Sequence, residues 1–197
     1  MLTQEQIDGV IAFHGHHCPG LTFGIRVGGW VLQEFGYAAD EEIVAVVESD
    51  MCAVDAIQYL VGCTFGKGNL VFLDYGKNAY SFFRRSDGKN VRLMTRGGLL
   101  TDLREQEKLP AADDDAGRES IRRKMIDRIM LADFDALFSM SPAQVPMPEK
   151  AQIYPSIRCD NCGELTMSTR LFNDALKTEG KNLCRFCAPP FAAVGCR

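Results

Sequence analysis

The sequence predicts an α+β core domain followed by a small C-terminal treble-clef zinc finger. Helical and strand patterns mix along residues 1–145 without the strict alternation of a doubly wound sheet. A stretch with four prolines follows, between positions 141 and 155, and it is typical of a linker. Two C-x-x-C pairs then lie near the end of the chain. We therefore expect a core domain over residues 1–145, and a linker with a treble-clef zinc finger over residues 146–197.

Caps and periodicity predict the elements of the N-terminal part. Thr3 and Gln6 form a capping-box pattern, which opens a helix that ends near Phe13. A second helix is expected over 21–35, where glycines at 20, 24 and 28 indicate close approach by another backbone. A valine-rich strand over 42–48 and a helix over 52–62, with Asp50 as candidate cap, come next.

The remaining elements of the core are predicted in the same way. A buried strand is expected over 69–74, and a hairpin joins strands over 80–85 and 91–95 through an Asp-Gly turn. Helical patterns then follow over 99–108, 118–132 and, for one or two turns, 134–140. In the tail, residues 165–172 alternate as a strand.

Composition excludes several classes of function. The net charge of −4 does not suit nucleic acid or an anionic membrane, and no apolar run has the length to span a bilayer. The first residues lack the basic and apolar regions of a signal peptide, so we expect a cytoplasmic protein. Thiols stay reduced there, and the eight cysteines are then metal ligands or reactive groups rather than disulfides.

The two C-x-x-C pairs predict a structural zinc site. Their four thiolates come from Cys159, Cys162, Cys184 and Cys187, and 21 residues separate the pairs. A spacing of two residues lets both thiolates of a pair reach one tetrahedral ion. Residues 151–197 carry six Lys/Arg and four Asp/Glu, and a four-thiolate zinc site adds about −2. This near-neutral balance gives no basic footprint for nucleic acid, so packing or dimerisation is the expected role.

A second cluster of metal-ligand residues lies in the core. His14, His16 and Cys18 alternate, and alternate side chains of an extended loop point the same way. Cys52 and Cys63 are further candidates, although a helix of this length separates them by about 16 Å. Imidazole and thiolate ligands suit zinc or another transition metal. The alternative is that the three cysteines are small buried apolar residues.

A glycine-rich loop follows the third helix. Thr64, Gly66, Lys67 and Gly68 have the residue types of an anion-binding loop, although the P-loop pattern is absent. A glycine-rich turn that leads into a buried strand explains the same residues equally well. The sequence leaves both readings open.

Three segments of this chain resemble the FmdE family, named for the FmdE component of formylmethanofuran dehydrogenase. They are His14-Gly15-His16-x-Cys18-Pro19-Gly20, Cys52-x-Val54-Asp55-Ala56 and Gly62-Cys63-Thr64-x-Gly66-Lys67-Gly68-Asn69. The resemblance implies an α+β core with an auxiliary treble-clef zinc finger, and a homodimer. It also implies a link to a molybdenum or tungsten enzyme that interconverts carbon dioxide and a formylated carrier. The chain has no pterin-cofactor or iron–sulfur motif with which to run that redox chemistry alone.

These observations support three hypotheses of function. The leading one is a metal-binding accessory protein or subunit of a molybdenum or tungsten enzyme, with Glu48, Asp50 or Asp55 orienting a histidine ligand. The second is a free-standing enzyme for a small anionic substrate, with Cys18 as nucleophile or with an open-site metal. The third is a metal chaperone or sensor. An open coordination position favours the enzyme, whereas four protein ligands favour structure or storage.

Overall fold

The computed structural model describes residues 2–97, 115–173 and 180–188. The chain divides into two compact units, residues 1–151 and residues 152–197. The first unit combines helices with a five-stranded sheet, as the α+β pattern predicts. The second unit holds the four tail cysteines. The helix expected over 99–108 lies outside the described residues.

Three helices form the N-terminal half of the core: α1 (Gln4–His14), α2 (Pro19–Glu34) and α3 (Ala53–Val61). The capping box of Thr3 and Gln6 opens α1 as the sequence predicts. Cys18 caps α2, and its Sγ accepts the backbone N–H of Leu21 at 3.4 Å. Cys52, rather than Asp50, occupies the N-cap position of α3. Two cysteines therefore stand at the starts of two helices.

The small residues of α2 let α3 approach it closely. A Cβ atom on Gly24 would lie 2.5 Å from the carbonyl oxygen of Ala53, so only glycine fits there. A Cβ on Gly20 would lie 3.3 Å from the Cβ and 3.6 Å from the Sγ of Cys52. The predicted close approach is confirmed, and it brings the starts of α2 and α3 together.

Five strands form one sheet in the order β2-β1-β3-β4-β5. Their bounds are β1 Ile43–Val47, β2 Leu70–Phe72, β3 Ala79–Arg84, β4 Asn90–Thr95 and β5 Phe138–Ser141. β1 and β2 are parallel and both end at the same edge, where Val47 pairs with Phe72. The other neighbours are antiparallel, and β3 and β4 form the predicted hairpin.

The segment over 134–140 corrects the sequence prediction of continued helix. After α5 (Asp115–Leu131) a single helical turn, α6 (Phe134–Leu137), leads directly into β5. β5 pairs with β4 so that Leu93 lies opposite Met140. This pairing joins residues about 45 positions apart in the chain, and a local pattern carries no signal for it.

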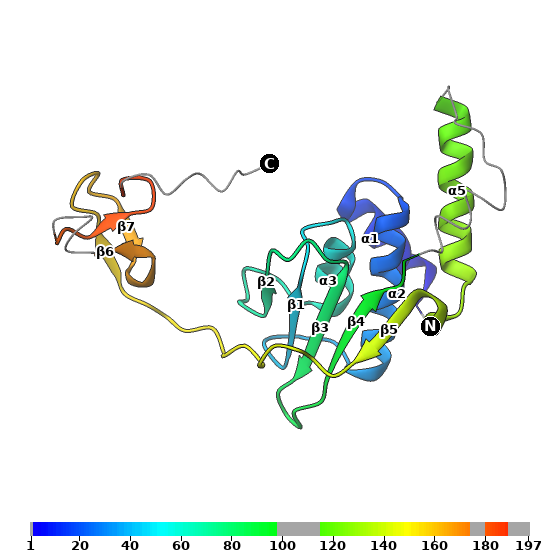
Figure 1. The fold of residues 1–197 in the computed structure, drawn as a ribbon, viewed down its shortest axis with the longest axis horizontal. Coiled ribbons are helices and arrows are strands. Elements are labelled where there is room, and N and C mark those ends of the chain that lie inside the picture. The colour runs from blue at the N-terminus through cyan, green and yellow to red at the C-terminus, as the bar shows by residue number, and fades with distance from the viewer. Residues whose placement is uncertain (1, 98–114, 174–179, 189–197) are drawn as a thin grey trace. The chain divides into compact units, whose positions relative to one another are not determined.

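The main core lies between the helices and one face of the sheet (Figure 1). α2 and α3 supply one side of this core and the central strands supply the other. The largest fully buried side chains of this core include Tyr80, Phe82, Phe138 and Ile57. Burial of such side chains contributes about 1.5–3 kcal/mol each and fixes the frame on which α3 starts.

The opposite face of the sheet is covered by the chain that follows β5. Val44, Val46 and Phe83 are buried on this face, and Ala143 and Val145 pack against them. Three hydrogen bonds hold this segment down: Ala143 N–H to Asn90 Oδ1 at 3.0 Å, Arg85 Nη1–H to the Pro148 oxygen at 2.9 Å, and Ala151 N–H to Glu41 Oε2 at 2.9 Å. Residues 142–151, which the sequence predicts as linker, thus pack on the core, and we call this segment the strap.

A buried ion pair crosses the same face. Arg92 of β4 donates from Nε to Glu48 Oε1 at 2.6 Å and from Nη2 to Glu48 Oε2 at 2.9 Å. Glu48 follows the last residue of β1, and β3 lies between β1 and β4. The β3 residue opposite Arg92 is Ser81, which is itself buried. The pair is bidentate, which is the strong geometry for arginine and carboxylate.

The second unit is built from short strands. They are β6 (Ser156–Arg158) with β7 (Leu165–Met167), and β8 (Leu171–Phe172) with β9 (Leu183–Cys184). The prediction of a single strand over 165–172 is wrong, because a 3₁₀ turn, η1 (Ser168–Arg170), separates two short strands there. The interruption lets one segment serve two hairpins, and each hairpin presents one cysteine pair.

Candidate metal centres

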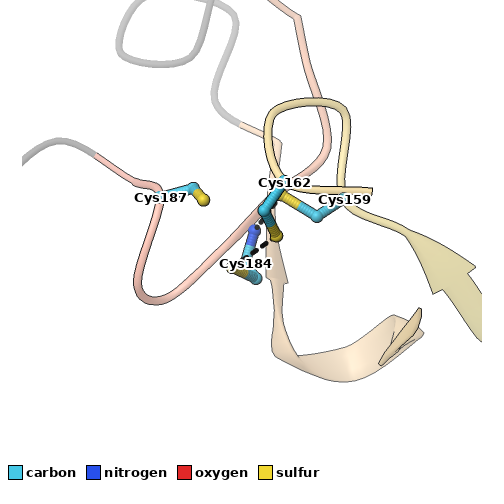
Figure 2. Close-up of side chains that lie close together, drawn as sticks. All are labelled: Cys159, Cys162, Cys184 and Cys187. Atoms are coloured by element: carbon cyan, nitrogen blue, oxygen red, sulfur yellow. Dashed lines mark hydrogen bonds between the residues drawn. The ribbon is translucent and has the colours of Figure 1, made fainter. Parts of the chain in front are cut away.

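The four tail cysteines converge on one point (Figure 2). Their sulfur atoms all lie within 4.8 Å of one another, as four ligands of one ion must. Gly163 adopts φ +75° directly after the first pair, and its N–H donates to the Cys159 carbonyl at 2.9 Å. This left-handed turn closes the loop that aims Cys159 and Cys162 together.

Backbone amides make this cluster suitable for thiolates. The backbone N–H of Cys184 donates to Cys159 Sγ at 3.3 Å. Hydrogen bonds from the backbone of Cys184 and then of Cys162 lower the pKa of the Cys159 thiol to about 6. Cys159 and Cys184 are buried, whereas Cys162 is exposed. Four converging thiols with one already favoured as thiolate fit a closed tetrahedral metal site.

A second cluster lies where α1 ends and α2 and α3 begin. A ring nitrogen of His14 and the Sγ atoms of Cys18 and Cys52 lie within 4.8 Å of one another. Each of the three side chains is partly buried. The sequence predicts His14, Cys18 and Cys52 as ligand candidates, and the structure brings them together.

The ring of His14 is held in one orientation. Its Nδ1 lies 2.6 Å from Asp55 Oδ2, and this carboxylate also accepts from Gln58 Nε2 at 3.4 Å through its other oxygen. The other ring nitrogen, Nε2, is buried and has no hydrogen-bond partner among the described residues. A carboxylate on one nitrogen and a free second nitrogen is the arrangement of a metal-binding histidine. The cluster therefore fits a metal ion bound through Nε2.

The helix starts supply the two sulfur ligands. Cys18 and Cys52 occupy the N-cap positions of α2 and α3, where the helix dipole favours a negative charge. Burial first, and then the hydrogen bond with Cys18, raise the pKa of the Cys52 thiol. A metal ion that binds there displaces the thiol protons of its cysteine ligands.

His16 and His17 take different positions around this cluster. The His16 ring lies beside the His14 ring with centroids 4.6 Å apart and the planes tilted by 36°, but His16 is exposed and lies outside the group of three. Nε2 of His17 lies 3.1 Å from Thr22 Oγ1, which ties this ring to α2. Only His14 among the histidines contributes to the cluster that the described residues form.

Cys63 lies apart from the cluster, in the main hydrophobic core. It is fully buried, and its Sγ donates to the Ile43 carbonyl at 3.5 Å. Burial raises the pKa of this thiol to about 12. The length of α3 separates Cys52 from Cys63, as the helix geometry predicts.

The glycine-rich loop binds its own chain. Lys67 Nζ donates to the Ala38 carbonyl at 2.7 Å and the Ala39 carbonyl at 3.4 Å. The Thr64 hydroxyl accepts the Lys67 backbone N–H at 3.3 Å. Gly68 packs so closely on Ala151 that a Cβ would lie 2.6 Å from it. These contacts give the loop a structural role, and its use for an anion stays a hypothesis.

A pocket of about 380 Å³ opens beside the core cluster. Two ligand candidates, His14 and Cys52, belong to its lining together with Asp55. The other lining residues are Val47, Ser49, Asp50, Met51, Val54, Gln58, Phe65 and Phe72. No sequence pattern marks Phe65, Phe72 or Met51 as site residues, because their places at the pocket depend on how strands and loop come together.

None of the helices in the described part of the chain combines the length and the apolar character that crossing a membrane requires.

Comparison with known proteins agrees with these features. The family described as "FmdE, Molybdenum formylmethanofuran dehydrogenase operon" matches residues 13–139, which include the whole core cluster. A "Probable S-adenosyl-L-methionine-binding protein" of Archaeoglobus fulgidus is 32% identical over 92% of this chain. The match spans 52% of that protein, so this chain has about half its length.

One solved structure has a similar fold. It is the crystal structure of a protein from Syntrophus aciditrophicus that is described as similar to FmdE of tungsten formylmethanofuran dehydrogenase. The similarity covers 93% of this chain and 90% of the other, with a TM-score of 0.55 and 23% sequence identity. At this identity the comparison supports the fold.

Proposed function

This chain belongs to the FmdE family, and from that premise we propose that it is a metal-binding accessory protein or subunit of a molybdenum or tungsten formylmethanofuran dehydrogenase. The description of the family supports the link to that enzyme. The observation that carries the metal-binding role is the buried Nε2 of His14, which has no hydrogen-bond partner among the described residues, on a ring that lies in the same cluster as two thiols. A buried polar atom without a partner is costly, and a metal ion satisfies it.

In this proposal His14 Nε2 and the sulfurs of Cys18 and Cys52 hold zinc or another transition metal. Asp55 fixes the His14 ring and its tautomer through Nδ1. The helix starts favour the two thiolates. A bound ion supplies Lewis acidity there.

We further propose that the tail cysteines bind structural zinc in a treble-clef module. Two hairpins that each present a C-x-x-C pair support this assignment, as does the closed set of four sulfur ligands. The helix that completes a treble clef would begin near Cys187, and residues 189–197 lie outside the described residues. A unit of this size gains much of its folding free energy from the ion.

A homodimer is the proposed assembly. Large apolar side chains that are exposed on the second unit, among them Leu165, Met167 and Phe186, support an interface role. Light scattering of the zinc-loaded protein checks it, and a monomer across the micromolar range contradicts it.

A metal-dependent enzyme is the second candidate function. Three protein ligands leave a fourth position open, which is typical of catalytic rather than structural zinc. The adjoining pocket of about 380 Å³ has the size of a small-molecule site. A chaperone or sensor needs a ligand set that releases the ion readily, and the partial exposure of all three ligands allows that too.

Metal analysis of the purified protein tests the two centres. We expect about two equivalents per chain, one of which is lost in Cys18→Ser and the other in Cys159→Ser. A single equivalent that disappears entirely with Cys159→Ser contradicts the core site. An anomalous-scattering map at several metal edges identifies each ion and its ligands.

The accessory role needs a separate test. Size-exclusion chromatography of the chain mixed with a purified molybdenum or tungsten formylmethanofuran dehydrogenase should show a joint complex. Cys18→Ser protein, loaded with zinc in its tail, is the matched control for dependence on the core metal. Separate elution of wild-type chain and enzyme at micromolar concentration contradicts the role.

A further inference from the structure

We propose that the pocket beside the core metal site binds a flat small molecule that is neutral or cationic, and that this molecule supplies the fourth metal ligand. The inference rests on the proposed core metal site and names the class of compound that it takes. This class differs from the small anionic substrate that the sequence suggested, because the pocket is lined by carboxylates and by no lysine or arginine among the described residues.

The place of the pocket in the fold is the first argument. Val47 and Phe72, the last residues of the parallel strands β1 and β2, both belong to its lining. The start of α3, with Cys52 and Val54, closes another side. In doubly wound α/β proteins, ligands bind at the carboxyl ends of parallel strands. This sheet has one parallel pair of strands, and the pocket lies at the carboxyl end of that pair.

Apolar and aromatic side chains form a large part of the pocket lining. Phe65 is 59% exposed, Phe72 is 37% exposed and Met51 is 53% exposed, although all three line the pocket. Val47 and Val54, which also belong to the lining, are buried. Large apolar side chains that line a concave site and remain accessible indicate a binding surface. Aromatic rings offer stacking to a flat partner, and methionine adapts to its outline.

The charges around the pocket disfavour anions. Asp50 and Asp55 lie in its lining, and none of the described residues that line it is a lysine or arginine. Two thiolates and a neutral histidine around a divalent ion sum to zero charge, so the two carboxylates set the sign of the site. Lys67 is close in sequence to Phe65, but its ammonium group donates hydrogen bonds to the Ala38 and Ala39 carbonyls.

The ligand must also carry a donor atom for the metal. Two of the three protein ligands, His14 and Cys52, line the pocket, so the open coordination position is reached from it. A ring nitrogen, an oxygen or a sulfur with a free lone pair serves this purpose. The class is therefore a flat heteroaromatic or conjugated compound that bears a neutral or cationic group.

Three pyridines whose 4-substituents carry different charges test the proposal on the full chain loaded with cobalt(II). They are 4-(aminomethyl)pyridine, a cation, 4-methylpyridine, which is neutral, and pyridine-4-carboxylate, an anion; none of them chelates. The visible cobalt spectrum reports binding at the open core site, while the closed four-thiolate site gives a constant background. We expect the cation to bind at least about tenfold more tightly than the anion, with the neutral compound between them.

Variants assign this preference to the pocket. Asp50→Asn should reduce the ratio of cation to anion affinity, whereas Asp74→Asn, an exposed aspartate outside the lining, should leave it unchanged. Phe65→Ala should weaken all three pyridines about equally. Unchanged affinities in both pocket variants overturn the proposal.

The outcomes separate this inference from the proposed function. If Cys18→Ser and Cys52→Ser leave cobalt content and spectrum unchanged, the core metal site itself fails. If cobalt binds through those cysteines but no pyridine perturbs its spectrum, or the anion binds most tightly, only the pocket assignment fails. The second result would point to a protein partner that covers Phe65 and Phe72.

Discussion

At the scale of single residues, the contact between His14 and Asp55 decides how well the core site binds metal. Asp55→Asn should weaken metal binding at that site about 10- to 100-fold, because the amide no longer fixes the ring as the carboxylate does. Competition with a chelator measures the effect. Asp50→Asn is the matched control, since Asp50 lines the pocket but makes no described contact with His14. Equal loss in both variants would contradict an orienting role.

The buried thiol of Cys63 should be inert in the native protein. Its pKa is raised to about 12, so it stays protonated and inaccessible at about pH 8. Iodoacetamide with mass spectrometry should leave Cys63 unmodified until denaturant is added. Because the folded-state pKa exceeds the usual value of 9.0, its contribution to stability is present below pH 9 and is lost as the pH rises towards 12. Rapid native labelling of Cys63 would contradict its burial.

The site residues were predictable to the extent that local spacing determines them. The His14 and Cys18 pattern and the cysteine pairs are visible in the sequence. Which of Glu48, Asp50 and Asp55 orients the histidine could not be predicted, because the answer depends on tertiary contacts. Strand register pairs Glu48 with Arg92, whereas Asp55 contacts His14.

At the scale of secondary structure, the α2–α3 contact positions the two sulfur ligands. Gly24→Ala should destabilise the protein by about 1–3 kcal/mol, because the added Cβ would overlap the backbone of Ala53. It should also lower metal affinity at the core site by forcing the starts of the helices apart. Denaturant unfolding and chelator competition measure the two effects.

Gly66→Ala is the control for this helix contact. A Cβ at position 66 meets nothing within 4 Å, and the glycine has no positive φ. We expect a change within about 0.5 kcal/mol and unchanged metal affinity. If Gly24→Ala behaves like this control, the helices are not held as closely as described.

The elements that carry local signals were predicted well. The capping box and the Asp-Gly hairpin act through neighbours in the chain, and the four-residue spacing of the α2 glycines marks the helix face that α3 contacts. β5 was missed because its stability comes from pairing with β4, and the strap after it was taken for linker because prolines mark both. The apolar contacts of the strap depend on the buried valines of β1, which are distant from it in the chain.

At the scale of the whole molecule, the two units should lose metal independently. Cys184→Ser removes one tail ligand and the amide–sulfur arrangement around Cys159, so the second unit should lose its ion and its fold. The core site should stay loaded, since its ligands all belong to the first unit. Metal content and amide NMR spectra check this. Loss of both ions together would contradict two separate modules.

The ion pair between Glu48 and Arg92 has a consequence for the inheritance of this sequence. The two side chains meet across β3, where Ser81 is opposite Arg92 and is buried. A bulkier residue at position 81 would block the ion pair. Loss of either charge alone would leave the other buried and unpaired, which would lower the stability of the protein by about 3–5 kcal/mol. The residues at positions 48, 81 and 92 should therefore covary among sequences that descend from this one, because a change at one position is tolerated only with matching changes at the others.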